Sequence, residues 1–470
     1  MFSSKTYTHR RTTLLSNVNS GIMLFLGNEE SPMNYADNTY HFRQDSSFLY
    51  YFGLNTPGLA AIIDADENKT ILFGDELTID HIVWMGSQPT IRNKAAMVGI
   101  TDVRPLSALP EYLRATKRHV HYLPPYRPDN KIKLSELLGI NIREQAANAS
   151  IPMIRAVVEQ RAVKEQQEIV EIEKAVNTTV EMHRAAMRFA QPGMRESEVA
   201  AMVANIALSE DGNLSFPIIA TINGQTLHNH YHGNIIKKGD LFLLDAGAET
   251  SMGYAGDMSS TFPISKTFTT RQKEIYQVAL NAHMAAVNAL KPGIAFKEVH
   301  LLAAKTIAQG MKDLGLMKGN IDDAVEAGAH AMFFPCGLGH MMGLDVHDME
   351  DLGEVYVGYE GKPKSTLFGL KSLRLARPLK PGFVLTIEPG VYFIPDLIDL
   401  WKSEKRHEQY LNYNKIEEYR NFGGIRNEED FVITETGAKL LGKPLAKTIE
   451  EVEYERTFSS KRTLFEQTIE

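Results

Sequence analysis

The sequence has 470 residues, of which 43% are hydrophobic and 23% are charged. This balance is typical of globular proteins, and the length is sufficient for two domains. The formal net charge of -8 and the isoelectric point near 6.0 argue against a nucleic-acid-binding protein, because phosphate binding requires a basic surface. Small molecules or peptides are therefore the expected partners.

The N-terminal segment MFSSKTYTHRRTTLL lacks the long apolar region of a signal peptide, and no later run is long enough to span a bilayer. The single cysteine, Cys336, rules out an intramolecular disulfide and agrees with a reducing compartment. We therefore expect a cytoplasmic protein that does not bind membranes. Cys336 is interpreted as a small buried residue rather than a ligand or nucleophile.

Residues 1–165 predict a mixed α/β domain. A helix is expected in HRRTTLLSNV, and strands are expected in GIMLFLG, LAAIIDA and TILFGDE, with turn-rich segments between them. The strongly aromatic stretch Phe42–Gly53 indicates a packed core or an interface. No catalytic group of residues stands out in this part of the chain.

Residues 166–470 contain an internal repeat. A long amphipathic helical pattern ends at Pro192-Gly193, and an offset of one hundred residues superimposes His183 on His283 and this turn on Pro292-Gly293. Both copies predict helix, turn and helix, followed by strands. The repeat indicates a pseudo-twofold domain with a site between its halves, in which 349–373 and 395–421 are expected to form surface loops or a lid.

Four carboxylates and one histidine stand at the ends of predicted strands or in glycine-rich loops: Asp245, Asp257, His340, Glu388 and Glu428. Each carboxylate alone is typical of a turn or cap. Crowded into one pocket they would repel severely unless cations neutralised them, so together they predict two divalent metals. A ligand set dominated by oxygen, with one imidazole, favours Mn²⁺, with Co²⁺, Zn²⁺ or Fe²⁺ as alternatives.

The runs LLDAGAE, GYAGDMSSTFP, GLGHMMGLDVHD, TIEPGVYF and GGIRNEED resemble, in order and spacing, the dinuclear metallopeptidases of the pita-bread fold. They are most similar to the Xaa-Pro aminopeptidase (aminopeptidase P) and Xaa-Pro dipeptidase (prolidase) branch. The segments YHFRQDSSFLYYFG and TILFGDELTIDHIVWMG resemble the non-catalytic N-terminal domain of that branch. The resemblance implies an α+β chain, with an N-terminal mixed α/β domain over 1–165 and a creatinase/aminopeptidase-like catalytic domain over 166–470.

The resemblance also implies the activity. A metal-bridged hydroxide would attack the carbonyl of the N-terminal residue before proline and so hydrolyse the bond between them. The enzyme would be an Xaa-Pro aminopeptidase or dipeptidase with short proline-containing peptides as substrates. The alternative is a pita-bread protein that has lost catalysis and only binds partners, against which all five metal-binding side chains argue. A two-metal phosphatase or nuclease lacks support, because no phosphate-binding motif is present.

By the same resemblance, each ligand has a role. One metal is chelated by Asp245, the other is held by His340 and Glu388, and both are bridged by Asp257 and Glu428. Glu428 is preferred to Glu429 because it follows the arginine of GGIR by two positions, as in the family pattern. Asn427 departs from the usual apolar residue there, and Cys336 replaces a histidine commonly found before GLGH.

Two histidines are implied to face the substrate. His228 and His347 would donate hydrogen bonds to the scissile carbonyl or the tetrahedral intermediate, although His230 and His232 compete with His228. Glu388 would also act as the general base that passes a proton to the leaving nitrogen.

Arg374 matches the arginine that grips the substrate's C-terminal carboxylate in prolidases, and arginine suits that role by its bidentate geometry. The alternatives are that Arg377 binds this carboxylate instead, or that Arg374 only makes a surface salt bridge. The choice between dipeptides and longer peptides therefore stays open. The resemblance further implies a homodimer or higher homo-oligomer, in which Trp84 reaches a neighbouring subunit's site.

Overall fold

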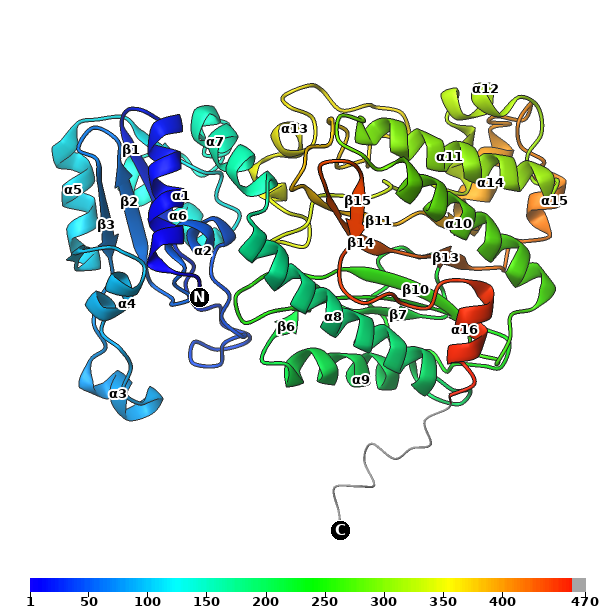
Figure 1. Cartoon of the computed structure of the whole chain (residues 1–470), viewed down its shortest axis with the longest axis horizontal. Coiled ribbons are helices and arrows are strands. Elements are labelled where there is room, and N and C mark those ends of the chain that lie inside the picture. Colours follow the sequence, from blue (N-terminus) through cyan, green and yellow to red (C-terminus); the bar gives the residue numbers. More distant parts are fainter. Residues whose placement is uncertain (459–470) are drawn as a thin grey trace, which may run out of the picture. The chain divides into compact units, whose positions relative to one another are not determined.

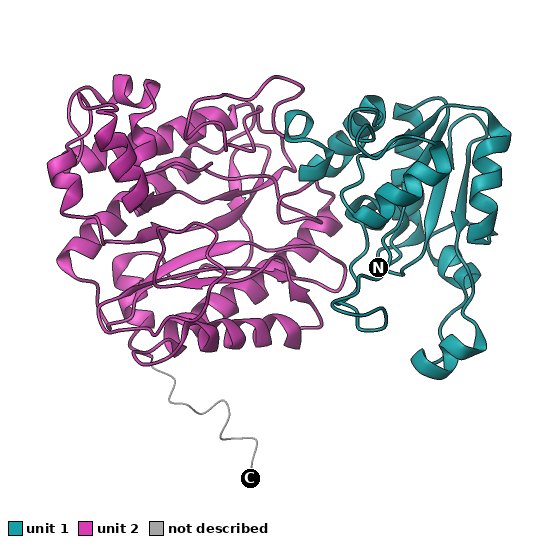
Figure 2. Cartoon of the chain, turned by 180° about the vertical axis from the view of Figure 1, so that it is seen from behind, with its two compact units in different colours: residues 1–162, 349–357 teal, residues 163–348, 358–470 magenta. Residues whose placement is uncertain are grey.

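The computed structural model describes residues 1–458. It separates into two units, coloured in Figure 2. The first unit is Met1–Ala162 with Met349–Val357, and the second is Val163–Asp348 with the described part of Gly358–Glu470. No helix in the described part of the chain is long and apolar enough to cross a membrane.

The first unit contains a mixed five-stranded sheet in the order β4-β3-β2-β1-β5. The expected strands are present as β1 (Ile22–Leu26), β2 (Ala60–Asp64) and β3 (Lys69–Phe73), which pair antiparallel. The edge strands β4 (Asp102–Arg104) and β5 (Val120–Tyr122) add in parallel. The prediction of a mixed α/β domain is therefore confirmed.

The remaining elements of the first unit are seven helices, two short 3-10 turns and one further short helix: α1 (Ser4–Asn17), α2 (Ser46–Phe52), α3 (Ile79–Met85), α4 (Ile91–Met97), η1 (Leu106–Ala108), α5 (Leu109–Thr116), α6 (Pro128–Leu138), α7 (Ile151–Ala162), η3 (Glu350–Leu352) and α13 (Glu354–Val357). Every residue of the aromatic helix α2 is buried, with the Phe48 and Phe52 rings 4.7 Å apart. Asp45 caps this helix by accepting from the Phe48 N–H, and Gly53 ends it with φ 63°. Of the two readings of the aromatic stretch, α2 fits the packed core.

The repeat appears in the second unit as two long helix pairs. The first pair is α8 (Gln166–Phe189) and α9 (Glu196–Ser209), and the second is α10 (Thr270–Ala289) and α11 (Phe296–Asp313). The turn in each pair is made by a glycine with positive φ, 92° at Gly193 and 85° at Gly293. The predicted sequence of helix, Pro-Gly turn and helix is confirmed in both copies.

Each helix pair lies beside strands of its own half (Figure 1). The first half has the sheet β10-β8-β7, and the second has β11-β14-β15 and the hairpin β12-β13. Their bounds are β7 (Ile219–Thr221), β8 (Leu241–Ala246), β10 (Met258–Pro263), β11 (Val384–Ile387), β12 (Gly390–Tyr392), β13 (Gly424–Arg426), β14 (Glu429–Ile433) and β15 (Ala438–Leu440). The Glu428 N–H donates to the Ser259 carbonyl at 2.9 Å, so the two halves are joined at the strand ends that carry the acidic residues.

The smaller elements of the second unit are β6 (Asn213–Leu214) paired with β9 (Ala248–Glu249), α12 (Ile321–Glu326), η2 (Ala329–Met332), α14 (Pro395–Ser403), α15 (Tyr413–Glu417) and α16 (Ile449–Glu455). The expected loop over 395–421 is therefore partly helical. The Trp401 side chain is 1% exposed and packs on Phe368, so α14 is held by a buried apolar face. In the other expected insertion, η3 (Glu350–Leu352) and α13 fall within the first unit.

Candidate metal centre and active site

Three predicted ligands from distant parts of the chain meet in one buried cluster. Asp257 precedes β10, His340 lies in a glycine-rich loop, and Glu428 lies between β13 and β14. They offer ligand atoms that all lie within 4.8 Å of one another. Glu388 at the end of β11 joins them, because its Oε1 lies 3.5 Å from Nε2 of His340, which is also 3.4 Å from Oδ2 of Asp257.

The fifth predicted ligand, Asp245, stands at the edge of this cluster. It lies opposite Ser259 in the antiparallel register of β8 and β10, and it is 8% exposed. Its carboxylate accepts a hydrogen bond from the guanidinium of Arg426. Burial is the main cause that raises the pKa values of Asp257 and Glu388, and the Asp245 charge raises them further, which places Asp245 in the same electrostatic group.

The neighbouring residues Glu428 and Glu429 have different surroundings. Glu428 accepts from the Ser259 hydroxyl at 2.8 Å and belongs to the cluster. Glu429 pairs with Lys447 at 2.5 Å and lies 3.5 Å from His283. Successive residues of an extended chain point to opposite faces, so only one of the two carboxylates can enter the cluster.

The carboxylates are crowded in a way that suits cations. Burial, followed by the Asp257 and Glu388 charges, raises the pKa of Glu428 well above its usual range. Burial also raises the pKa of Glu388 to about 7. Among the described residues Oδ1 of Asp257 is buried without a hydrogen-bond partner. Buried carboxylates left in this state are stabilised by bound metal, so the side chains present fit divalent cations.

The loop around His340 fixes the orientation of its ring. Nδ1 lies 3.0 Å from the Met341 carbonyl, which can only accept, so Nδ1 carries the proton and Nε2 faces Asp257 and Glu388. A Cβ on Gly339 would lie 2.1 Å from the Thr386 carbonyl oxygen. The close approach of this loop to β11 therefore requires glycine, which explains the GLGH run.

Arg426 is a site residue whose role sequence reasoning missed. It is 4% exposed, and its guanidinium donates to Ser259 at 2.8 Å and to the Tyr392 hydroxyl at 3.1 Å as well as to Asp245. The available signal was an arginine inside the buried strand GGIR, where an unpaired charge would be costly. Tyr392 and Ser259 gave no comparable signal, because hydroxyl residues are common in strands.

The predicted substrate residues lie near the cluster. His228 is exposed, and partial desolvation, followed by the Arg426 and Arg374 charges, lowers its pKa, whereas the Asp245 charge raises it. His232 instead directs Nε2 to the Ile218 carbonyl at 3.1 Å. The centroid of the His347 ring lies 4.3 Å from that of His340.

Arg377 and Cys336 have other surroundings. Arg377 is buried, lies 3.4 Å from Glu360 and stacks on Phe383. Cys336 is half-buried rather than fully buried as expected, and desolvation together with the Glu388 charge raises the pKa of its thiol to about 12. A thiol of such high pKa stays protonated and makes a poor nucleophile.

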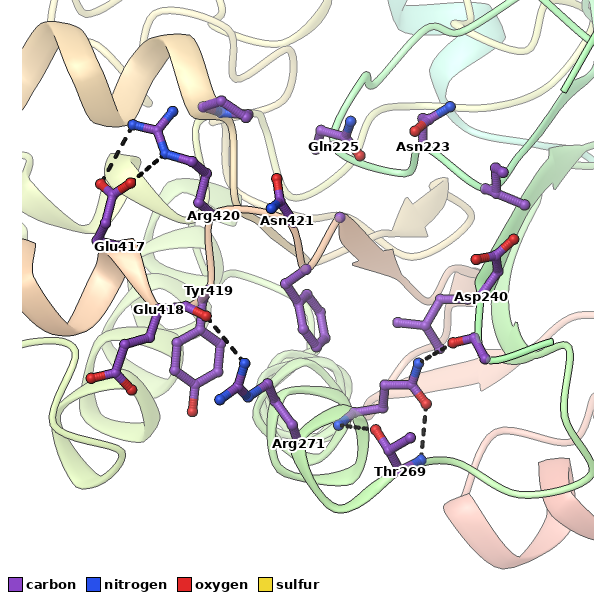
Figure 3. A pocket seen from close by; sticks show the side chains of 17 residues that line it. Asn223, Gln225, Asp240, Thr269, Arg271, Glu417, Glu418, Tyr419, Arg420 and Asn421 are labelled. Carbon is purple, nitrogen blue, oxygen red and sulfur yellow. Dashed lines mark hydrogen bonds and ion pairs between the residues drawn. The ribbon is translucent and has the colours of Figure 1, made fainter. Parts of the chain in front are cut away.

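A separate cavity of about 570 Å³ lies at the starts of β8 and β13, whereas two of the predicted ligands lie at or after the ends of these strands. It is lined by Leu241 at the start of β8 and by Gly423 just before β13, and none of the five predicted ligands is among its described lining residues. Figure 3 shows the Arg271 guanidinium beside Tyr419, where it donates to the Glu418 carbonyl at 3.1 Å. This cavity is therefore distinct from the acidic cluster.

Comparison with known proteins gives the family. The model of metallopeptidase family M24 matches residues 170–435, and that of the aminopeptidase P N-terminal domain matches residues 7–122. The human Xaa-Pro dipeptidase is 32% identical over 92% of this chain and 88% of its own length. The Xaa-Pro aminopeptidase of Escherichia coli (strain K12) is 29% identical over 96% of this chain and 97% of its own.

Solved structures of aminopeptidase P also match this chain in fold. The Zn-substituted aminopeptidase P of E. coli in complex with product superposes with a TM-score of 0.80 at 27% identity, over 98% of this chain and 100% of that one. The Pseudomonas aeruginosa aminopeptidase PepP gives 0.81 at 25% identity, over 97% and 99%. The expected pita-bread fold, preceded in the sequence by an N-terminal mixed α/β domain, is confirmed, and the chain belongs to metallopeptidase family M24.

Proposed function

We propose that this protein is a dinuclear metal-dependent exopeptidase that hydrolyses the bond between an N-terminal residue and proline. The observation that carries the proposal is the buried cluster of Asp257, His340 and Glu428, in which Oδ1 of Asp257 lacks a hydrogen-bond partner among the described residues. The similarity to Xaa-Pro peptidases over most of the chain supports the substrate class.

Five residues would hold the two ions. Asp245 would hold one, His340 and Glu388 the other, and Asp257 and Glu428 both. The oxygen-rich set favours Mn²⁺, with Co²⁺, Zn²⁺ and Fe²⁺ as alternatives. The two ions would supply Lewis acidity, because they would lower the pKa of the attacking water and polarise the scissile carbonyl.

Glu388 is the proposed general base. Its side chain is 21% exposed, compared with 7% for Asp257, so it is the more accessible to substrate. It would take a proton from the attacking water and deliver it to the proline nitrogen, which leaves as a secondary amine. Proton delivery matters here because the proline nitrogen has no hydrogen of its own in the peptide bond.

His228 and His347 are the proposed donors to the substrate. The lowered pKa of His228 keeps its imidazole neutral at physiological pH, with one N–H to donate. Hydrogen bonds to the carbonyl oxygen strengthen as negative charge develops there, so they favour the transition state over the bound substrate.

Arg374 is proposed to bind the free carboxylate of an Xaa-Pro dipeptide. Its charge lies near enough to His228 to lower the pKa of that histidine. A bidentate guanidinium contact would select dipeptides, whereas an aminopeptidase would leave this side open for a longer chain.

The test uses metal-stripped protein reloaded with Mn²⁺ and assayed on Gly-Pro, Ala-Pro and a longer Xaa-Pro-Xaa peptide. The variant is Arg374→Ala, and the matched control is Arg271→Ala in the separate cavity. Cleavage confined to dipeptides and lost only in Arg374→Ala identifies a dipeptidase. Efficient cleavage of the longer peptide by both variants identifies an aminopeptidase. Absence of turnover on all three refutes the proposal in favour of an inactive binding protein.

We propose further that 1–165 is non-catalytic and 166–470 catalytic, in a cytoplasmic homodimer or higher oligomer. The single cysteine supports the location. Helix α3 supports assembly, because Ile79, Val83 and Trp84 are 71%, 72% and 87% exposed. Light scattering of the parent and of Trp84→Ser tests the proposed assembly. A monomeric parent would refute it.

A further inference from the structure

A buried ion pair lies beside the loop that carries His340 and His347. Lys164 Nζ is 2.7 Å from Asp348 Oδ2, and both side chains are 1% exposed. The two residues are 184 positions apart in the chain, so the pair ties the start of the second unit to this loop. Burying two charges costs free energy that their attraction offsets only with good geometry, so the pair calls for an explanation.

The pair is linked to His340 through one carbonyl group. The Asp348 backbone N–H donates to the Met341 carbonyl at 2.9 Å. The same oxygen lies 3.0 Å from Nδ1 of His340 and fixes which ring nitrogen faces the acidic cluster. A displacement of Asp348 would therefore move the acceptor that orients the His340 ring.

The pair is also linked to His347, which immediately precedes Asp348 in the chain. The rings of His340 and His347 meet edge to face, with centroids 4.3 Å apart. The position of Asp348 therefore bears on both histidines that the proposed function uses from this loop.

The surrounding backbone leaves the pair little room to move. A Cβ on Gly343 would lie 2.8 Å from both Cε of Lys164 and Oδ2 of Asp348. The Gly343 carbonyl accepts from the Ala255 N–H at 2.9 Å, and the Lys164 N–H donates to the Gly382 carbonyl at 2.8 Å. The ion pair is thus fixed against the segments that lead to Asp257 and to β11.

We propose that Lys164 and Asp348 are positioning residues that hold the 341–348 loop, so that His340 faces the metal ligands and His347 faces the substrate. This inference deepens the proposed function and rests on it. The pair acts through the two histidines and not by contact with substrate. The competing explanation is that the pair only stabilises the fold.

The two explanations differ in the behaviour of a double variant. Lys164→Met alone removes the ammonium that pairs with the buried Asp348 carboxylate, and both explanations expect it to lower stability. Lys164→Met with Asp348→Leu removes both charges, and buried pairs replaced by apolar side chains commonly regain stability. If the pair positions the loop, the double variant recovers its thermal midpoint but not its activity.

The expected result for the double variant is a kcat on the best Xaa-Pro substrate that is about 10–100-fold lower, with KM changed much less. Mn²⁺ affinity measured by calorimetry should fall by a similar factor, and the visible absorption of Co²⁺-loaded protein should change. The matched control is Arg118→Met with Asp64→Leu, which removes another ion pair of 2.7 Å in the first unit. That control should leave kcat, metal affinity and the Co²⁺ spectrum unchanged.

Recovery of kcat and metal affinity together with stability would overturn the inference. If the double variant does not fold, Asp348→Asn is measured in the same way, and unchanged kcat and metal affinity in it overturn the inference equally. A parent that cleaves no Xaa-Pro peptide refutes the proposed function instead. In that case the Mn²⁺ affinity and Co²⁺ spectrum still decide whether the pair orients His340.

Discussion

The guanidinium of Arg426 donates a hydrogen bond to the carboxylate of Asp245, so a buried cation of the protein itself contacts one of the five predicted metal ligands. The same side chain reaches Ser259 and Tyr392, which come from two other strands. Arg426 therefore partly neutralises the cluster and fixes its edge.

We expect Arg426→Lys to lower kcat/KM by about 10–100-fold, the usual cost of changing a group that orients a metal ligand. Lysine keeps the positive charge but cannot donate to three separate acceptors in a planar arrangement. Steady-state kinetics and bound-metal analysis test this expectation. Arg271→Ala, in the separate cavity, should behave as the parent; equal activity in Arg426→Lys would show that charge alone suffices.

We expect His340→Ala to bind one divalent ion less than the parent and to lose more than about 100-fold in turnover, because the ligand itself should matter more than its outer contacts. Elemental analysis after dialysis gives the metal content. The control is His232→Ala, whose ring faces the Ile218 carbonyl. Full metal content in His340→Ala would remove this histidine from the centre.

We expect the stability of the metal-free protein to fall as pH rises through about 7. The pKa of Glu388 is raised from 4.5 to about 7 in the folded protein, so the folded state holds this proton more tightly than the unfolded chain. Its contribution to stability is complete below pH 4.5 and is lost above 7. Thermal midpoints in chelator across this window should fall less steeply in Glu388→Gln, and added Mn²⁺ should raise the parent's midpoint at pH 8.

A buried histidine should make the stability of the protein fall at acid pH instead. Burial lowers the pKa of His300 from 6.5 to about 3, and among the described residues neither ring nitrogen has a hydrogen-bond partner. Its contribution to stability is present above pH 6.5 and is lost as pH falls towards 3. We expect His300→Leu to move the acid-unfolding midpoint down by about 0.5 pH unit. Circular dichroism measures this, and exposed His230→Leu should leave the midpoint unchanged.

Much of the fold could be predicted because its signals are local. The strands that carry Asp245 and Glu388 are apolar runs ended by a carboxylate and followed within two residues by glycine, and the Pro-Gly turns stop both helix pairs. Helix α14 was missed because its two buried side chains, Ile398 and Trp401, lie among charged residues. Their spacing of three positions fits a helix, but two residues are too few to establish a period.

The parts of the site that could not be predicted depend on contacts between distant segments. The partners of Arg426 lie 34, 167 and 181 positions away, and nothing near it in the chain indicates them. The same holds for Lys164, whose partner is 184 positions distant. Residue types and spacing could suggest which side chains share a pocket, but not which charge neutralises which.

The repeat has a consequence for how the centre assembles. Asp245 and Asp257 belong to the first half, whereas His340, Glu388 and Glu428 belong to the second. Neither half alone supplies a complete ligand set, and each alone would expose carboxylates that only the other half encloses. Fragments separated between β10 and α10 should therefore regain high-affinity metal binding only when mixed, which makes metal affinity a direct report on the pairing of the two halves.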